Sequence, residues 1–214
     1  MTAIKQRLFD RKKLQVIERE FLAHYPKGFD DPGLEKVRKS HRMDKMTEFA
    51  SQAFNKKACR DIEQTVANMI KIVSRSSMVS MFEKPKFRDF INGLNLNDQA
   101  FLVNSLKQLL HGKQALGFEA LVDILTTEKL AKWSLVTIIP AYYSPQHEVF
   151  VKPTTAKGVI KHFELEGVEY KPLPSWEFYE RYRDLILEMR SQVDPSLAPN
   201  NAAFCGFLMM SLER

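Results

Sequence analysis

Residues 133–163 read WSLVTIIPAYYSPQHEVFVKPTTAKGVIKHF, and in this stretch alone the spacing of the apolar residues changes. Before and after it, apolar residues recur at helical spacing. Inside it, residues 135–139 and 149–151 form two short runs rich in β-branched and aromatic side chains, separated by the turn-like SPQH at 144–147. Because such residues favour strands, the pattern predicts an antiparallel β-hairpin around residues 134–152.

The segments outside this stretch have the amphipathic pattern of helices, and Pro, Gly and capping residues separate them. The helices expected cover residues 2–25, a segment beginning at 34, and residues 44–54, 62–73, 87–91, 98–111, 113–125, 155–163, 175–189 and 200–212. We therefore expect a mainly α domain with a minor β part. In it, a hairpin or a three-stranded antiparallel sheet packs among the helices, and residues 168–170 are the candidate third strand.

Length and charge suggest how the chain is organised. The 214 residues fit one domain. The net charge of +6 is uneven, because residues 1–60 hold 15 Lys and Arg against 8 Asp and Glu, whereas residues 61–214 hold 17 against 18. The sequence thus divides into a basic helical segment, 1–60, and a mainly helical core with the hairpin, 61–214. We expect the two to form one compact unit.

A basic helix face makes nucleic acid the first partner to consider. Arg38, Arg42 and Lys45 recur at i, i+4 and i+7 of the helix that begins at residue 34. Lysine and arginine side chains neutralise backbone phosphates and release counterions. The candidate nucleic-acid-binding residues are Arg11, Lys12, Lys13, Arg38, Lys39, Arg42 and Lys45. The alternative is an ordinary solvated helix face.

A second candidate site lies at residues 152–157 (KPTTAK), where the expected strand runs directly into a helix. The amino end of a helix presents free N–H groups and partial positive charge, and lysines stand on both sides of it. Lys152, Thr154, Thr155 and Lys157 are therefore candidates for binding a phosphate or a carboxylate. The alternative is that a threonine only caps the helix and the lysines are solvated.

The usual signatures of catalysis and metal binding do not occur in the sequence. It contains no G-x-S-x-G, P-loop, G-x-G-x-x-G or H-E-x-x-H motif, and its five histidines are scattered. We predict no catalytic residue, no metal and no cofactor.

The cysteines and the amino terminus bear on the cellular location. Cys59 and Cys205 lie far apart and suit a reducing compartment. With no signal peptide or membrane span expected, the chain should be a soluble cytoplasmic protein without a membrane partner.

The order of two helices and a hairpin in residues 98–152 is similar to that of a winged helix, which would place a helix or the hairpin on DNA. Two features argue against this arrangement. The expected strands are apolar on both faces, as in a buried sheet. The helix at 113–125 would be the recognition helix, yet it carries Glu119 and Asp123 and no arginine.

The last helix, residues 200–212, is apolar nearly all round, which predicts central burial or an interface between copies of the chain.

Together, these sequence features leave three functions open. The leading hypothesis is a non-enzymatic binding protein whose partner is nucleic acid or another protein. The alternatives are an enzyme acting on a phosphorylated or anionic substrate at residues 152–157, and a structural protein that self-associates through residues 200–212.

Overall fold

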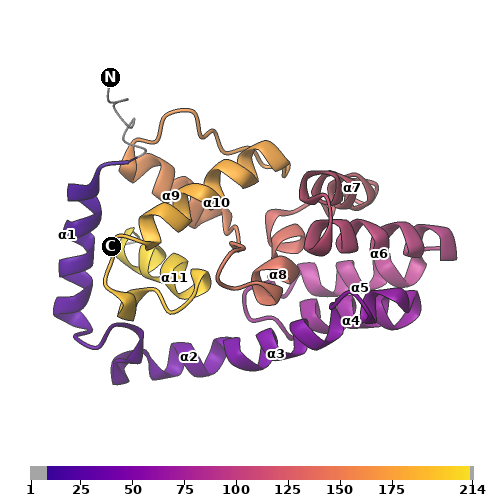
Figure 1. Ribbon diagram of the computed structural model, residues 1–214, viewed down its shortest axis with the longest axis horizontal. Coiled ribbons are helices and arrows are strands. Elements are labelled where there is room, and N and C mark those ends of the chain that lie inside the picture. The colour runs from indigo at the N-terminus through magenta and orange to yellow at the C-terminus, as the bar shows by residue number, and fades with distance from the viewer. Residues whose placement is uncertain (1–8, 213–214) are drawn as a thin grey trace.

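The computed structural model describes residues 9–212, and this part of the chain is mainly helical, as predicted (Figure 1). The α-helices are α1 (Arg11–His24), α2 (Glu35–His41), α3 (Met43–Ala53), α4 (Ile62–Arg75), α5 (Glu83–Gly93), α6 (Leu96–His111), α7 (Gln114–Thr126), α8 (Trp133–Tyr143), α9 (Pro153–Phe163), α10 (Trp176–Arg190) and α11 (Asn201–Leu212). Four short 3₁₀ turns join them, namely η1 (Gly28–Asp30), η2 (Pro32–Leu34), η3 (Ala58–Arg60) and η4 (Pro195–Leu197).

The predicted hairpin around residues 134–152 is wrong, because the described residues contain no strand and residues 135–139 belong to α8. The helix is buried along nearly its whole length, so its sequence shows no polar face. A short apolar run of this kind fits a buried helix as well as a buried strand, and periodicity alone does not separate them. Thr137 suits the helix because its hydroxyl donates to the carbonyl oxygen of Trp133 at 2.6 Å.

The second run, residues 149–151, belongs to no helix and has no partner strand among the described residues. Its backbone N–H groups form hydrogen bonds with side chains instead. The N–H of Val149 donates to the hydroxyl of Tyr179 at 3.2 Å, and the N–H of Val151 donates to the hydroxyl of Thr137 at 3.0 Å. Buried backbone groups need partners, and here they find them outside a β-ladder.

Two further expectations fail with the hairpin. Residues 168–170 lie in a connection between α9 and α10 and form no third strand. The winged-helix arrangement needs a hairpin after residue 134, and residues 9–212 hold none. Glu119, which lies on the helix that would have been the recognition helix, forms a contact within the chain. It accepts a hydrogen bond from the N–H of Trp176 at 2.6 Å and so links α7 to the start of α10.

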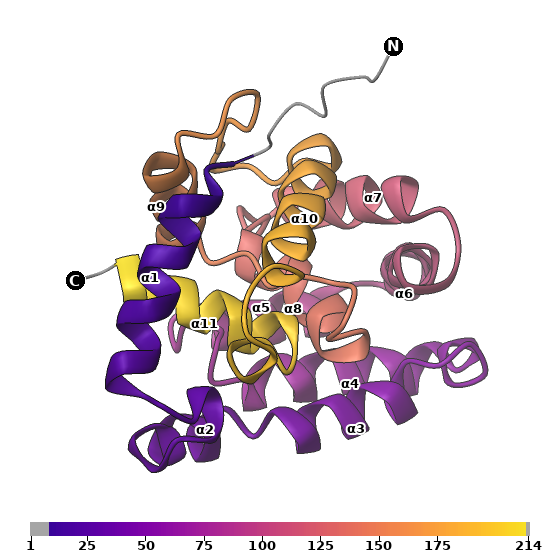
Figure 2. The same ribbon diagram turned by 60° about the vertical axis from the view of Figure 1, so that its left-hand side comes forward.

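The helices form two groups with α8 between them (Figures 1 and 2). One group contains α3 to α7 and packs against α8. The other contains α1, α9, α10 and α11, and Figure 2 shows α1 lying across α11. The buried apolar residues of both groups make one continuous core.

The last helix is part of that core. Phe204, Phe207 and Leu208 are fully buried, and the ring of Phe207 meets the ring of Phe21 edge-on at 5.2 Å between centroids. One side of α11 is therefore buried in the core, whereas its other residues are half-buried, and whether these form an interface between copies of the chain stays a prediction. Within residues 9–212, no helix combines the length and the apolar character that crossing a membrane would need.

Candidate functional site

The first predicted site is the basic face of residues 38–45, and two of its cations are engaged inside the chain. The guanidinium of Arg38 donates to the carbonyl oxygens of Phe29 and Asp31, the latter at 3.2 Å. It thereby ties the turn before α2 to that helix. Lys39 forms an ion pair with Glu35 at 2.7 Å, one helical turn away.

The other two cations of this face, Arg42 and Lys45, are exposed and form no ion pair with any described residue. Arg42 has a φ of 48° and separates α2 from α3. The i, i+4, i+7 spacing therefore does not describe one continuous helix, since Arg38 lies on α2 and Lys45 lies on α3.

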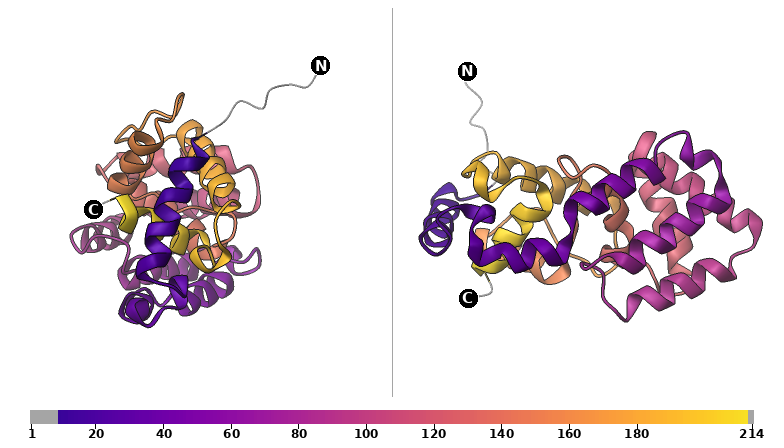
Figure 3. Two further views of the ribbon diagram at one scale, coloured as in Figure 1. Left: turned by 90° about the vertical axis from the view of Figure 1, so that its left-hand side faces the viewer. Right: turned by 90° about the horizontal axis from the view of Figure 1, so that it is seen from below.

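The cluster of Arg11, Lys12 and Lys13 does not join this face. It begins α1, whereas α2 follows the opposite end of α1 (Figures 1 and 3). Lys13 donates to Glu164 at 2.7 Å and to the carbonyl oxygen of His162 at 2.9 Å, so it ties α1 to the end of α9. Arg11 lies 4.0 Å from Glu188 of α10, and Lys12 is exposed.

A different set of cations comes together where α3 turns into α4. Here a cavity of about 240 Å³ opens between this turn and the end of α6. We call it the basic hollow, and it is lined by Lys56, Arg60, Lys107, Gln108, His111 and Gly112. Its lining includes no carboxylate, and within residues 9–212 none of its three Lys and Arg side chains forms an ion pair.

Local structure fixes the walls of the basic hollow. His111, the last residue of α6, bonds through Nε2 to the carbonyl oxygen of Phe54 at 2.7 Å. Since a carbonyl only accepts, Nε2 carries the proton and the imidazole is held in place. Gly112 follows, and a Cβ there would come within 2.3 Å of the Gln108 side-chain oxygen. That oxygen accepts from the N–H of Lys113 at 3.1 Å, so a larger residue at position 112 would displace the Gln108 side chain and break this bond.

None of the predicted nucleic-acid-binding residues lines the basic hollow. The charge count pointed to residues 1–60, which supply Lys56 and Arg60. The three residues from α6, Lys107, Gln108 and His111, are about fifty residues away in sequence and follow no local motif. Only tertiary packing brings them beside the α3–α4 turn.

The second predicted site, residues 152–157, begins a helix as expected, but neither threonine is its cap. Lys152 is the N-cap residue of α9 and makes no side-chain capping bond. Thr154 and Thr155 lie inside the first turn, and Thr155 is buried. The ammonium of Lys157 lies 4.9 Å from the centre of the Tyr170 ring, a cation–π contact.

The prediction of anion binding at this turn has a direct test. If the turn binds phosphate, millimolar phosphate should raise the melting temperature of the protein, and Lys157→Ala should abolish that rise because it removes a cation beside the helix start. The measurement is differential scanning fluorimetry across a phosphate series at constant ionic strength. An unchanged melting temperature in the wild type would show that phosphate does not bind there.

Sequence reasoning missed a buried polar cluster around Glu148. This carboxylate is 7% exposed. It accepts hydrogen bonds from the hydroxyl of Tyr179 at 2.6 Å and from Nε2 of Gln114 at 2.8 Å, and Arg183 lies 3.3 Å away. Burial and the neighbouring carboxylate raise the pKa of Tyr179 well above its usual value, so the hydroxyl stays protonated and donates. The backbone is bonded as well, because Nδ2 of Asn201 donates to the Glu148 carbonyl at 3.0 Å.

This cluster connects α7, α10 and α11 to the segment between α8 and α9. Arg183 lies over the ring of Trp176, with 5.3 Å between the guanidinium carbon and the ring centre. Glu148 lines neither the basic hollow nor the larger cavity beside Lys152. We therefore interpret the cluster as structural. No signal near Glu148 in the sequence indicates it, because its partners lie about thirty residues away in either direction.

The remaining groups with metal-binding or nucleophilic chemistry do not assemble into a site within the described residues. In residues 9–212 no three His, Cys, Asp or Glu side chains are grouped so that they could hold a metal ion. Burial raises the pKa of the Cys205 thiol to about 12 and also raises the pKa of Cys59. Both thiols are therefore protonated at neutral pH, which keeps them unreactive.

Comparison of this chain with models of protein families, with curated proteins and with solved structures finds no match.

Proposed function

We propose that this protein is a non-enzymatic binding protein that holds nucleic acid by its backbone phosphates, with the basic hollow as the main contact. One observation supports the proposal most. Lys56, Arg60 and Lys107 surround a single cavity, and no carboxylate among the described residues neutralises them. Cations that have no internal partner are available to a phosphate.

The chemistry of the lining suits a phosphate group. The guanidinium of Arg60 can donate two parallel hydrogen bonds to phosphate oxygens, and Lys56 and Lys107 add compact positive charges. The cavity of about 240 Å³ has room for such a group. It is a surface hollow, so a phosphate that belongs to a polymer can enter while the rest of the chain stays outside.

Further cations extend this contact along α3. Arg42 and Lys45 stand at its beginning, and Lys56 and Lys57 follow its end. The helix is about 16 Å long at about 1.5 Å per residue, and a duplex carries one charge per roughly 1.7 Å of its axis. Seen from below, α2 and α3 run along the near face of the molecule (Figure 3, right). Because the exposed Glu48 interrupts this stripe, we place the main contact at the basic hollow.

Binding should depend steeply on salt and on the basic hollow. Each phosphate neutralised on duplex DNA contributes about −0.9 to the slope of log K against log salt. Lys56→Gln/Arg60→Gln should therefore weaken binding similarly for every sequence and flatten the slope by roughly two units. The measurement is fluorescence anisotropy with duplex and single-stranded oligonucleotides across a salt series.

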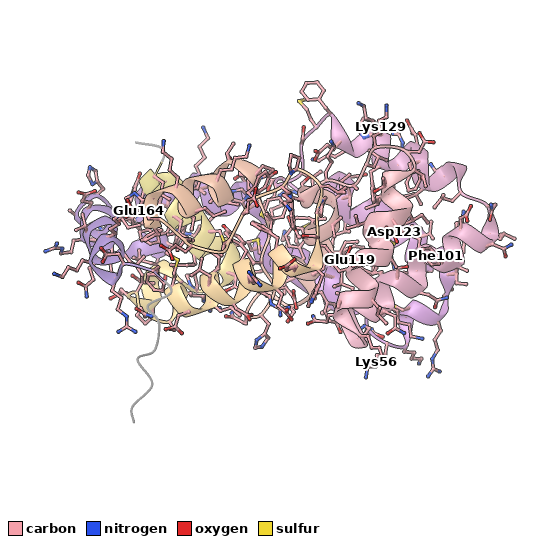
Figure 4. All side chains as sticks on the ribbon, turned by 90° about the horizontal axis from the view of Figure 1, so that it is seen from above. Lys56, Phe101, Glu119, Asp123, Lys129 and Glu164 are labelled. Atoms are coloured by element: carbon pink, nitrogen blue, oxygen red, sulfur yellow. The ribbon has the colours of Figure 1, made fainter. Side chains whose placement is uncertain are left out.

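A matched control has the same change of charge at a distance. Lys129 is exposed on the opposite side of the molecule from Lys56 (Figure 4), and Lys161 is exposed on α9. Lys129→Gln/Lys161→Gln should leave both affinity and slope close to those of the wild type. Absence of binding at low salt, or equal losses in the two double variants, would contradict the proposal. A third variant, Arg42→Gln/Lys45→Gln, should reduce the slope less than the hollow variant.

A cytoplasmic location is part of this proposal. Cys59 and Cys205 are both free, and unpaired thiols suit a reducing compartment. Self-association through residues 200–212 stays a prediction, although Phe204, Phe207 and Leu208 are already buried inside the chain.

A further inference from the structure

A larger cavity, of about 730 Å³, lies between the two groups of helices and takes no part in the proposed nucleic-acid contact. We call it the cleft. Its wall is formed by the α4–α5 connection, the starts of α5, α8 and α9, and the connection after α9. Its volume falls in the range of about 300–1,000 Å³ that is typical of small-molecule sites.

The wall of the cleft has an apolar part and a charged part. Met78, Phe150, Tyr170 and the buried Trp133 supply apolar and aromatic surface. Met81, another apolar residue of the lining, is 74% exposed.

The charged part of the wall is positive. Lys84, Lys132 and Lys152 line the cleft, and none of them forms an ion pair within residues 9–212. The only carboxylate in the described lining is Glu83, which already accepts a hydrogen bond from the hydroxyl of Ser134 at 2.7 Å. Three lysines therefore face one engaged carboxylate.

Helix ends add to this positive potential. The first residues of α5, α8 and α9 all line the cleft, namely Glu83, Trp133 and Pro153. The amino end of each helix carries partial positive charge. The N–H groups of Glu83 and Lys84 already donate to the Ser80 carbonyl oxygen and Pro153 has no N–H, so these helix ends contribute electrostatic potential rather than a set of free donors. Three such ends at one cavity, together with three lysines, favour a negative group inside it.

We propose that the cleft binds a small organic acid, with a carboxylate or phosphate held near Lys84 and Lys132 and a ring-sized apolar body against Phe150 and Tyr170. A purely apolar molecule would leave the lysines of the wall without a counter-charge. A bare inorganic ion would leave the apolar part of the wall without a contact. Lys152 faces the cleft from the start of α9 and also contacts Sδ of Met209 at 3.0 Å, so it contributes charge from the edge.

Calorimetric titration with two matched probes tests this inference. Naphthalene-2-carboxylate offers an apolar ring body and a negative charge, whereas naphthalene-2-carboxamide has the same body without the charge. The acid should bind at least about tenfold more tightly than the amide, because only the acid uses the lysines. Lys84→Gln/Lys132→Gln should reduce the affinity for the acid to that for the amide.

Two further variants separate this site from the others. Lys129→Gln/Lys161→Gln removes the same charge elsewhere, and Lys56→Gln/Arg60→Gln removes it from the basic hollow. Both should bind the acid as the wild type does, so the result does not depend on whether nucleic acid binds. Undetectable binding of the acid, equal binding of acid and amide, or an unaffected Lys84→Gln/Lys132→Gln variant would overturn the inference.

Discussion

Replacing Glu148 by alanine should lower the free energy of unfolding by about 3–5 kcal/mol, because it removes the buried carboxylate that pairs with Arg183. Of its polar partners among the described residues, Arg183 then keeps only the exposed Asp184 at 3.6 Å and the side-chain oxygen of Gln114 at 3.2 Å. Arg183 has a side chain only 13% exposed and lies 3.3 Å from the Glu148 carboxylate. The same change removes the nearer of two acceptors of the buried Tyr179 hydroxyl, the carboxylate at 2.6 Å, and leaves the Val149 carbonyl oxygen at 3.3 Å. Urea denaturation followed by circular dichroism measures the loss.

The control and the double-mutant cycle decide how the loss arises. Glu166→Ala removes an exposed carboxylate from the connection after α9 and should change stability by less than about 0.5 kcal/mol. Glu148→Ala/Arg183→Met should be more stable than the sum of the two single losses predicts, because the guanidinium is then removed together with its buried partner. A loss below about 1 kcal/mol for Glu148→Ala would show that water replaces the carboxylate and that the cluster does not hold the helices together.

The helices whose sequence has a clear apolar stripe were the predictable part of the fold. The stripe through Ile62, Val66, Met69 and Val73 predicted α4, and Ser175 was correctly expected to cap the start of α10. These features are local, because the spacing and the capping residue stand in the element itself. Residues 135–139 lack such a signal. The helix they belong to is surrounded by other helices, so no polar face marks its period.

Residues 149–151 show why the second half of the hairpin was also mispredicted. Their composition suits a strand, but the backbone partners of Val149 and Val151 are the side chains of Tyr179 and Thr137 in place of another strand. Local sequence does not indicate which distant group satisfies the backbone hydrogen bonds.

The candidate sites also differ in whether local sequence could reveal them. Residues 152–157 form one continuous stretch, so the helix start beside two lysines was visible in the sequence. The basic hollow needs α6 next to the α3–α4 turn, and the cleft needs the starts of three helices at one place. Neither arrangement follows from spacing along the chain, because packing of distant elements creates both.

Replacing Phe207 by alanine should also cost about 3–5 kcal/mol, through lost transfer free energy and the cavity that remains. The ring is fully buried, meets Phe21 of α1 edge-on, and lies 5.8 Å from the ring of Phe204. It therefore joins the first described helix to the last. Urea denaturation measures the cost, and Val16→Ala, which removes methyl groups from an exposed position of α1, is the control.

The same variant distinguishes two hypotheses for α11, namely that it serves the core of its own chain or that it forms an interface between copies of the chain. If Phe207 serves only the core of its own chain, the variant loses stability and its molecular mass in solution, measured by light scattering, stays that of the wild type. If copies of the chain associate through α11, the mass should fall while the circular dichroism of the monomer is kept. A variant with unchanged stability and unchanged mass would contradict both readings, because a buried ring of this size cannot be removed from a packed core without a cost.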